Sequence, residues 1–297
     1  MRINKILDLA RNLEVKRTVG VAAAEDEVVL KAVEKAVNEG ICNVVLYGNE
    51  NKIKNIANEN NIDLSKMEIV HCVSDKESVI KTIEDVSSGK TDLPMKGHIT
   101  TGELLSVYLK EEYGLRTKST INLVSVFDIE KYHKLLIVTD AGMVIAPTLE
   151  QKVDSINNAV KVANALEIEI PKVAIVGALE KVNQKMPATI DAAIISQMNR
   201  RGQIKGCIVD GPFAMDNAIS KEAAEQKGIV SEVAGDADIV IMPDIEAGNI
   251  FYKSMVFLSG AKVSSTILGG KKPVVLTSRA DSDETKLLSI ALSVLLA

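Results

Sequence analysis

The chain has 297 residues, of which 46% are apolar and only 3% aromatic, enough to fill the core of one large or two medium domains. A formal net charge of -5, with so few rings on which bases can stack, argues against a nucleic-acid partner. The N-terminus carries charges throughout, and no segment approaches roughly 18 uncharged apolar residues, so we expect a cytoplasmic protein without a membrane span.

Helical and strand patterns alternate from one end of the chain to the other. Helices are predicted over residues 3–14, 27–39, 50–60, 74–86, 103–112, 148–166, 188–200, 216–227, 245–258 and 284–296. Strands are predicted over residues 18–22, 43–47, 68–73, 92–95, 121–127, 134–139, 172–176, 204–209, 238–242 and 273–276. The alternation predicts an α/β protein with largely parallel sheets and right-handed crossovers. The short polar linker between 121–127 and 134–139 indicates a β-hairpin or a crossover between domains.

Two such sheets predict two α/β domains with a cleft between them. We expect the first domain to comprise residues 1–132 and 280–297, and the second to comprise residues 133–279. In open α/β sheets, ligands bind beyond the carboxyl ends of the strands. We therefore expect the active site in the cleft, near the polar clusters that begin at Lys96, Asp140, Asp210, Pro243 and Ser278.

The last predicted strand, 273–276, leads directly into a serine, an arginine and several acids. An arginine fork matches the oxygens of phosphate or carboxylate, and a neighbouring carboxylate can take a proton. Taken alone, these residues also fit a capped helix N-terminus, where early acids favour the helix dipole. The other motifs favour an anion site, so the catalytic candidates are Ser278, Arg279, Asp281 and Asp283.

The segment from Lys96 to Gly102 is a loop that enters a helix. Gly97 permits unusual backbone angles or the close approach of a ligand. Backbone N–H groups at the helix start can bind phosphate oxygens, although a plain capped helix would use similar residues. A lysine and a histidine beside this glycine exceed what capping needs. The predicted anion-binding residues are therefore Lys96, Gly97, His98, Thr100 and Thr101.

A second polar segment follows the predicted strand 238–242. Asp244 is suited to cap the next helix, and Glu246 suits its first turn. Gly248 costs that helix about 1 kcal/mol relative to alanine, so a ligand facing the backbone beside Asn249 is the functional interpretation. We expect Asp244, Glu246 and Asn249 to bind ligand. The turn 210–216 either caps a helix or lines an acyl pocket.

Several familiar signatures are missing from the sequence. It has no Walker loop, no dinucleotide-binding glycine motif, no HExxH motif and no GxSxG elbow. The three histidines are far apart in sequence, and no metal site is predicted. Cys42, Cys72 and Cys207 form no CxxC pair and are expected to be reduced thiols. Cys207 falls in the predicted strand 204–209, where a buried, inert thiol is expected.

Nearly the whole chain resembles the phosphate acetyl/butyryltransferase family, and most of all its butyryl branch. The segments that carry the resemblance are Met95–Gly97, Leu115–Thr117, Lys205–Pro212, Val233–Asp238, Pro243–Asn249 and Val274–Ser282. The resemblance implies two α/β domains like those of isocitrate and isopropylmalate dehydrogenases. It also implies the reversible reaction of acyl-CoA with inorganic phosphate to give acyl phosphate and CoA. Coenzyme A is then a substrate, and no cofactor or metal is required.

The resemblance also implies roles for individual residues. In the acetyl-transferring relatives, the pair that matches 278–279 lies in the active site, and an aspartate farther along deprotonates the CoA thiol. One of the acids within 281–284 would take that role here. An arginine of those relatives is matched by Ser106, so Lys96 or Arg116 would supply the missing positive charge. We expect direct transfer in a ternary complex without an acyl-enzyme.

Two other classes of protein stay open at this point. One is an NAD- and metal-dependent hydroxy-acid dehydrogenase of the same architecture, in which Asp210, Asp216 and Asp244 would converge as metal ligands. The other is a binder of small anions without turnover. Butanoyl is the expected acyl group, with acetyl and branched acyl groups as alternatives, because a methylene is worth only about 1–3 kcal/mol in a pocket. A homodimer or higher homo-oligomer is expected, with the apolar helix 245–258 as a candidate interface.

Overall fold

The computed structural model describes residues 2–277 and 281–297. By their internal contacts these residues divide into two compact units. The terminal unit comprises the described residues within 4–118 and 264–297, and the central unit comprises residues 2–3 and 119–263. The division expected from the sequence, at residues 132/133 and 279/280, stays a prediction.

The terminal unit is built on a four-stranded parallel sheet in the order β3-β2-β1-β4. Its strands are β1 (Thr18–Ala22), β2 (Asn43–Gly48), β3 (Glu68–His71) and β4 (Leu93–Lys96). Val21 of β1 and Met95 of β4 are fully buried, as expected for parallel strands covered on both faces. Because β1 and β4 are parallel neighbours, their carboxyl ends meet at the same edge of the sheet.

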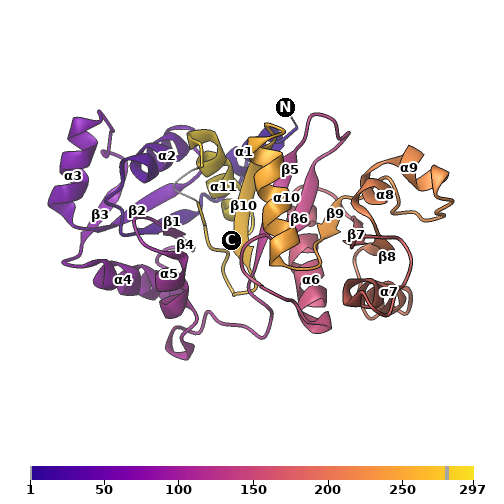
Figure 1. The fold of residues 1–297 in the computed structure, drawn as a ribbon. Coiled ribbons are helices and arrows are strands. Elements are labelled where there is room, and N and C mark those ends of the chain that lie inside the picture. The colour runs from indigo at the N-terminus through magenta and orange to yellow at the C-terminus, as the bar shows by residue number, and fades with distance from the viewer. Residues whose placement is uncertain (1, 278–280) are drawn as a thin grey trace. The chain divides into compact units, whose positions relative to one another are not determined.

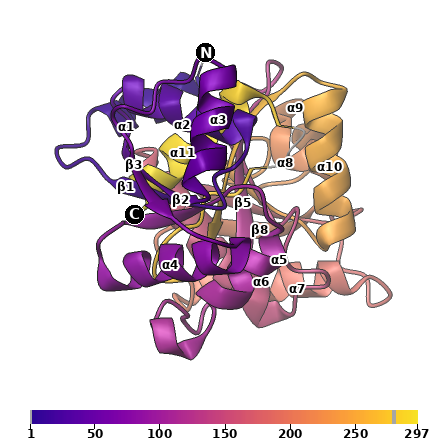
Figure 2. The ribbon, with the colours of Figure 1, turned by 90° about the vertical axis from the view of Figure 1, so that its left-hand side faces the viewer.

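Helices cover both faces of this sheet. They are α1 (Asn4–Arg11), α2 (Glu27–Asn38), α3 (Glu50–Glu59), α4 (Asp75–Ser88), α5 (Thr101–Tyr108) and α11 (Asp283–Leu295), with a 3-10 turn at Glu111–Tyr113. Figures 1 and 2 show α4 on one side of β1 and β2, and α2 and α11 on the other. The last helix, α11, packs on α1 and α2, so the end of the chain lies against its beginning.

The central unit holds the sheet β10-β5-β6-β9-β7-β8, of which β10 (Lys262–Leu268) passes into the terminal unit after Val263. The other strands are β5 (Asn122–Asp128), β6 (Leu136–Thr139), β7 (Lys172–Val176), β8 (Ile208–Phe213) and β9 (Ile239–Ile241). The helices are α6 (Leu149–Ala165), α7 (Pro187–Arg200), α8 (Met215–Ile219), α9 (Lys221–Gln226) and α10 (Ile245–Phe257). Strands β5 and β6 are an antiparallel pair, whereas β6, β9, β7 and β8 run parallel. The predicted α/β class with largely parallel sheets is confirmed.

Two predicted elements of the central unit were wrong in their bounds. Strand β8 begins four residues later than the predicted strand 204–209, so Cys207 precedes it and Pro212 lies inside it. A proline is tolerated there because β8 is an edge strand, where one N–H is not needed. The predicted helix 216–227 is two helices, because Ser220 ends α8 and caps α9 by accepting from the N–H of Ala223 at 3.2 Å.

Strand β10 was missed, and the predicted strand 273–276 is present only as isolated bridges. β10 carries Ser264, Ser265 and Thr266 in its middle, all buried, so neither alternation nor an apolar run marks it. Its hydroxyls are satisfied instead, as when Ser264 Oγ donates to the Leu288 carbonyl at 2.9 Å. Val275 forms a bridge with Met95 in β4. Along the described ranges, no helix has the length and apolar character needed to cross a bilayer.

Candidate active site

The carboxyl end of β4 is extended by a chain segment from far along the sequence. The N–H of Val275 donates to the Pro94 carbonyl at 2.9 Å, and the N–H of Lys96 donates to the Val275 carbonyl at 3.2 Å. These bonds align Val275 beside β4 in the parallel sense. Thr277, two residues on, therefore reaches the same edge of the sheet as the ends of β1 and β4.

The loop after β4 lies directly against the loop after β1. The N–H of Gly97 donates to the Ala22 carbonyl at 2.8 Å, and that of His98 donates to the Ala23 carbonyl at 2.7 Å. A Cβ at Gly97 would come within 2.1 Å of the Ala23 carbonyl oxygen. Gly97 is thus required for the contact between two protein loops, and these two N–H groups already have protein acceptors.

Thr100 and Thr101 form the beginning of α5. The Thr100 hydroxyl accepts from the N–H of Glu103 at 3.2 Å, and the Glu103 carboxylate accepts from the N–H of Thr100 at 2.7 Å. The latter contact lowers the pKa of Glu103. This reciprocal capping box accounts for Thr100 as a helix cap. Anion binding by Thr100 and Thr101 stays a prediction.

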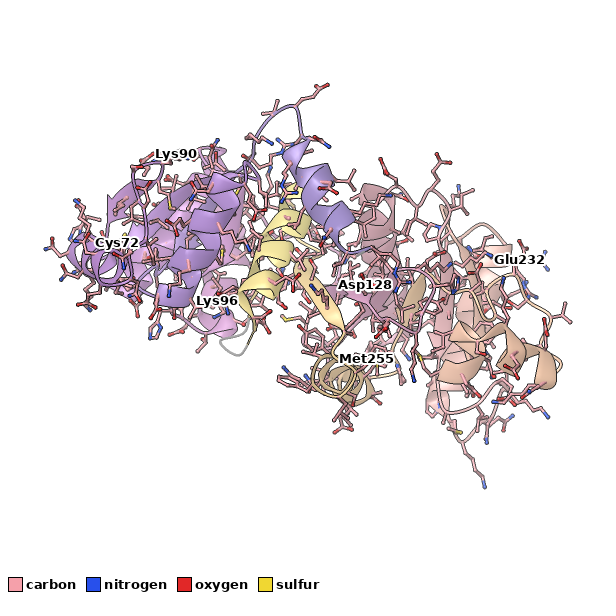
Figure 3. The ribbon with its side chains drawn as sticks, turned by 90° about the horizontal axis from the view of Figure 1, so that it is seen from above. Cys72, Lys90, Lys96, Asp128, Glu232 and Met255 are labelled. Carbon is pink, nitrogen blue, oxygen red and sulfur yellow. The ribbon has the colours of Figure 1, made fainter. Side chains whose placement is uncertain are left out.

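Lys96 is a buried cation of this region. Its residue is only 8% exposed, and its Nζ donates to the carbonyls of Gly97 at 3.2 Å and Ile99 at 3.0 Å. Figure 3 shows Lys96 beside α11. Burying an ammonium group is costly unless acceptors or a counter-charge compensate for the lost water. The ammonium group of Lys96 is therefore suited to bind an anion at this edge of the sheet.

A small cavity lies at this edge of the sheet. It measures about 110 Å³ and is lined by Asp26, Val28, Val29, Lys96, Gly97, Thr277 and Lys286. Since a water molecule occupies about 30 Å³ in the liquid, this space suits a small ion. A ligand as large as coenzyme A does not fit, because drug-sized ligands take about 300–1,000 Å³.

The imidazole of His98 lies next to a carboxylate that lines the cavity. Asp26 caps α2 through Oδ1, which accepts from the N–H of Val29 at 2.9 Å. Its Oδ2 lies 3.5 Å from Nδ1 of His98, whose side chain is exposed. The predicted binding residue His98 is thus placed beside the cavity, although it does not line it.

The catalytic candidates Ser278 and Arg279 lie outside the described residues. Thr277, which directly precedes them in the sequence, lines the cavity. Asp281 is half-buried, and its backbone carbonyl accepts a hydrogen bond from Nζ of Lys286. Asp283 is exposed in the first turn of α11, whose cap is Ser282. Of the two acids, Asp281 has its backbone tied to a residue of the cavity.

Arg116 has a different environment from Lys96. It is exposed, and over residues 2–277 and 281–297 its guanidinium has no hydrogen-bond or ion-pair partner. Its neighbour Leu115 is buried and accepts from the N–H of Lys271 at 2.8 Å. The backbone of this segment is therefore held in place, and binding of an anion by Arg116 stays a prediction.

In the central unit, the predicted ligand-binding segment at the start of α10 is used for packing. Asp244 caps the helix by accepting from the N–H of Ala247 at 2.8 Å. A Cβ at Gly248 would come within 2.0 Å of the Asp140 carbonyl oxygen, and Asn249 Nδ2 donates to the Ala141 carbonyl at 3.1 Å. These contacts dock α10 on the loop after β6, so a ligand is not needed to explain Gly248. Glu246 is exposed.

Asp140 stabilises the loop after β6, against which α10 packs. Its carboxylate accepts from the N–H groups of Gly142 at 2.7 Å, Met143 at 3.0 Å and Val144 at 3.0 Å. Burial raises the pKa of Asp140, and these donors oppose that rise. The polar cluster predicted at this strand end therefore has its own backbone donors.

The three aspartates that a dehydrogenase would need as metal ligands have separate roles. Asp210 lies 3.7 Å from Arg200, Asp216 pairs with Lys227 at 3.0 Å, and Asp244 is a helix cap. Among the residues that the structure describes, no group of three or more acids, histidines or cysteines is arranged to hold a metal ion. Cys207 is buried, and burial raises the pKa of its thiol to about 11, as expected for an inert cysteine.

Sequence reasoning missed two charged residues that line the cavity, Asp26 and Lys286. Asp26 has the pattern of an ordinary helix cap. Lys286 carried a usable signal, because it shares one face of the last helix with Ser289, Ile290 and Ser293, and all four are buried. A lysine on the inner face of an apolar helix indicates a buried charge with a role.

Comparison with known proteins identifies the family. The chain matches the family model described as phosphate acetyl/butaryl transferase over residues 1–83 and 74–294. It is 54% identical to a phosphate acetyltransferase of Thermotoga maritima over 100% of both chains, and 48% identical to a phosphate butyryltransferase of Clostridium acetobutylicum over 99% of this chain and 97% of that one. A branched-chain phosphotransacylase from Enterococcus faecalis is similar in structure, with a TM-score of 0.83 at 32% identity over 94% of this chain and 98% of that one. The chain belongs to the phosphate acetyl/butyryltransferase family.

Proposed function

We propose that this protein catalyses the reversible transfer of a short-chain acyl group between coenzyme A and inorganic phosphate. The observation that carries the proposal is the small cavity lined by Lys96 and Thr277, directly before Ser278 and Arg279 in the chain. A buried ammonium together with a guanidinium supplies the positive charge and the donors that phosphate requires. Membership of the family supports the same reaction.

The chemistry runs in one step within a ternary complex. Towards the thioester, the CoA sulfur attacks the carbonyl carbon of the acyl phosphate, a C–S bond forms, and the C–O bond to phosphate breaks. Lys96, Ser278 and Arg279 hold the departing phosphate. The thiol proton passes to a carboxylate, a transfer worth about 10²–10⁴ in rate. Holding both reactants together supplies the remaining advantage through proximity.

Asp281 is our choice for the proton acceptor. Its carbonyl is bound by Lys286, whereas Asp283 is exposed. Asp281→Asn is expected to lower kcat by about 10²–10⁴, the usual contribution of a general base. Asp283→Asn is the matched control, because it makes the same change two residues away and should leave kcat near the wild-type value. A larger loss of kcat in Asp283→Asn than in Asp281→Asn would show that Asp283 accepts the thiol proton.

The remaining binding candidates are proposed as supports for the CoA and phosphate substrates. They are Gly97, His98, Thr100, Thr101 and Arg116 in the terminal unit. Asp244, Glu246 and Asn249 of the central unit, which the sequence indicated as ligand-binding residues, are not proposed as substrate contacts, because Asp244 caps α10, Asn249 donates to the Ala141 carbonyl and Glu246 is exposed. Gly97 acts through the loop contact that it permits. Arg116 has an exposed guanidinium, which suits a phosphate of the nucleotide part of CoA.

The test of the reaction is thiol release from butanoyl-CoA, measured with and without inorganic phosphate. Release should require phosphate, and Arg279→Ala should reduce turnover by about 10²–10³, the usual cost of removing one donor to developing negative charge. Arg11→Ala is the control, because Arg11 is a surface arginine of α1 paired with Asp8. Near-wild-type turnover of Arg279→Ala in a correctly folded protein would refute the assignment.

Butanoyl is the expected acyl group, and acetyl is the alternative. Relatives named for each activity are similar to this chain, at 48% and 54% identity. One methylene in an apolar pocket changes specificity by about 10–200-fold, so kcat/KM measured with acetyl-, butanoyl- and branched acyl-CoA separates the possibilities. A maximum at acetyl-CoA would replace the butanoyl proposal without changing the reaction class.

A homo-oligomer and a cytoplasmic location stay predictions. Ile250, Phe257 and Leu258, in or directly after α10, are 68%, 64% and 86% exposed, which is consistent with the interface expected on this helix. The mass of the protein in solution, measured by light scattering, decides whether it associates. A monomeric mass at micromolar concentration would contradict the prediction.

A further inference from the structure

We propose that Lys286 on α11 binds the inorganic phosphate substrate in the cavity at the end of β4. The inference rests on the proposed function, because it names a residue that would hold one of the two substrates. It adds a group that neither the sequence motifs nor the expected Ser278–Arg279 pair includes.

The first observation is the burial of Lys286 without a counter-charge. The residue is 2% exposed and lines the cavity, and its Nζ donates to the backbone carbonyl of Asp281. Among the described residues it has no carboxylate partner. A buried ammonium group is stable only when paired or fully hydrogen-bonded, and one carbonyl satisfies one of its three donors. The remaining donors are suited to an anion that enters the cavity.

A second buried lysine, Lys152, shows how a lysine with a structural role is usually paired. Lys152 on α6 is 4% exposed, but its Nζ lies 2.6 Å from the carboxylate of Asp191. This pair is what a structural buried lysine requires. Lys286 is buried to the same degree, but within residues 2–277 and 281–297 it has no such carboxylate partner.

The second observation is the charge and size of the cavity. Two ammonium groups, Lys96 and Lys286, line it with one carboxylate, Asp26. That carboxylate already accepts from the N–H of Val29 and lies near His98, so it only partly offsets the two cations. A volume of about 110 Å³ matches a small anion rather than coenzyme A. Inorganic phosphate is the small anion of the proposed reaction.

Lys286 lies in the buried part of its helix, where residues 286–294 are all buried. Leu287 and Leu288, which directly follow Lys286, are also buried, and α11 packs against α2. Val28 and Val29 of α2 line the same cavity. Lys286 is therefore buried within the packed part of α11 and lines the cavity beside two apolar residues of α2.

The experiment compares Lys286→Met, Lys286→Arg and the control Lys152→Met in the full-length chain. Lys286→Met should raise the KM for inorganic phosphate by about 10- to 100-fold, as expected for one lost charge-assisted hydrogen bond, and leave the KM for acyl-CoA unchanged. Lys286→Arg keeps the charge and should recover most of the phosphate affinity. Lys152→Met should lose stability and keep the wild-type phosphate KM.

Phosphate binding without turnover keeps this inference separate from the proposed function. Inorganic phosphate should raise the Tm of the wild type and not that of Lys286→Met, whose own Tm without phosphate should be no lower than the wild-type value. A wild type that binds phosphate but transfers no acyl group would overturn the proposed function and leave the inference standing. A wild-type phosphate affinity in Lys286→Met, or a rise confined to the KM for acyl-CoA, would overturn the inference.

Discussion

Two polar segments follow parallel strands in this protein, and they use their polar groups in opposite ways. At the end of β4, the two lysines 96 and 286 are buried around a cavity with one carboxylate. At the start of α10, Asp244 caps the helix, and Asn249 donates to the carbonyl of Ala141. Position at a strand end is therefore not enough to identify a site. The distinguishing property is a buried ammonium group, that of Lys286, which has no carboxylate partner among the residues that the structure describes.

The largest expected effect is on stability, because each of the two segments contains a glycine that lies against a backbone carbonyl. Gly97→Ala and Gly248→Ala each place a Cβ within 2.1 Å or less of a carbonyl oxygen, so each should cost over about 3 kcal/mol of unfolding free energy in a urea titration. Gly102→Ala is the control, because its nearest neighbour is the Thr100 hydroxyl at 4.0 Å. It should be neutral or stabilising by up to about 1 kcal/mol. Wild-type stability of either clashing variant would show that the close approach is absent.

The next effect separates the segments by function. Lys96→Met should lower kcat/KM for phosphate by about 10²-fold, because a charge-assisted hydrogen bond is lost from a buried site. Lys90→Met is the control, since Lys90 is exposed and pairs with Asp85 at 3.0 Å. Steady-state kinetics of both variants with butanoyl-CoA and phosphate make the comparison. Equal effects of the two substitutions would remove Lys96 from the site.

A third prediction tests whether charges of the central unit serve stability. Asp236 accepts from Lys172 Nζ at 2.7 Å and His133 Nε2 at 2.8 Å, with Lys134 Nζ at 3.1 Å. Burial alone would raise the pKa of Asp236, but the hydrogen bonds from Lys172, His133 and Lys134 outweigh it and lower the pKa. The folded-state pKa is then below the unfolded value of about 3.9, so this stabilisation is present above pH 3.9 and is lost as the pH falls further.

Asp236→Asn checks this expectation. It should cost about 1.5–3 kcal/mol at pH 7, and its difference from the wild type should shrink in acid. Unfolding free energies measured from pH 7 down to pH 2 give the comparison. A difference that does not change over this range would contradict the proposed linkage.

The smallest effect concerns Asp244, which the sequence indicated as a ligand-binding residue. As a helix cap, Asp244→Ala should cost about 1 kcal/mol of stability and leave kcat/KM close to the wild-type value. Glu246 lies two residues after Asp244, and its side chain is exposed, so Glu246→Ala should change neither the stability nor kcat/KM. A loss of kcat/KM confined to Asp244→Ala would instead show that this segment meets the substrate.

Much of the fold was predictable because local signals agree with the tertiary structure. Asp26, Ser74 and Thr148 each precede an apolar-periodic run and each caps the helix expected there. The errors occurred where tertiary contacts override the local signal. The hydroxyls of β10 are satisfied by partners such as the Leu288 carbonyl, and Pro212 is accepted because β8 is an edge strand.

The candidate site was predictable in part for the same reason. The sequence singled out Lys96 and Gly97, which line the cavity, because their residue types at a strand end are unusual for a helix cap. The sequence also determined the α/β class and the family, since both depend on residue order along the chain. Only the tertiary structure decided that Gly97 meets the Ala23 carbonyl and that Lys286 shares a cavity with Lys96. Burial and counter-charge depend on residues far apart in sequence, and folding alone brings them together.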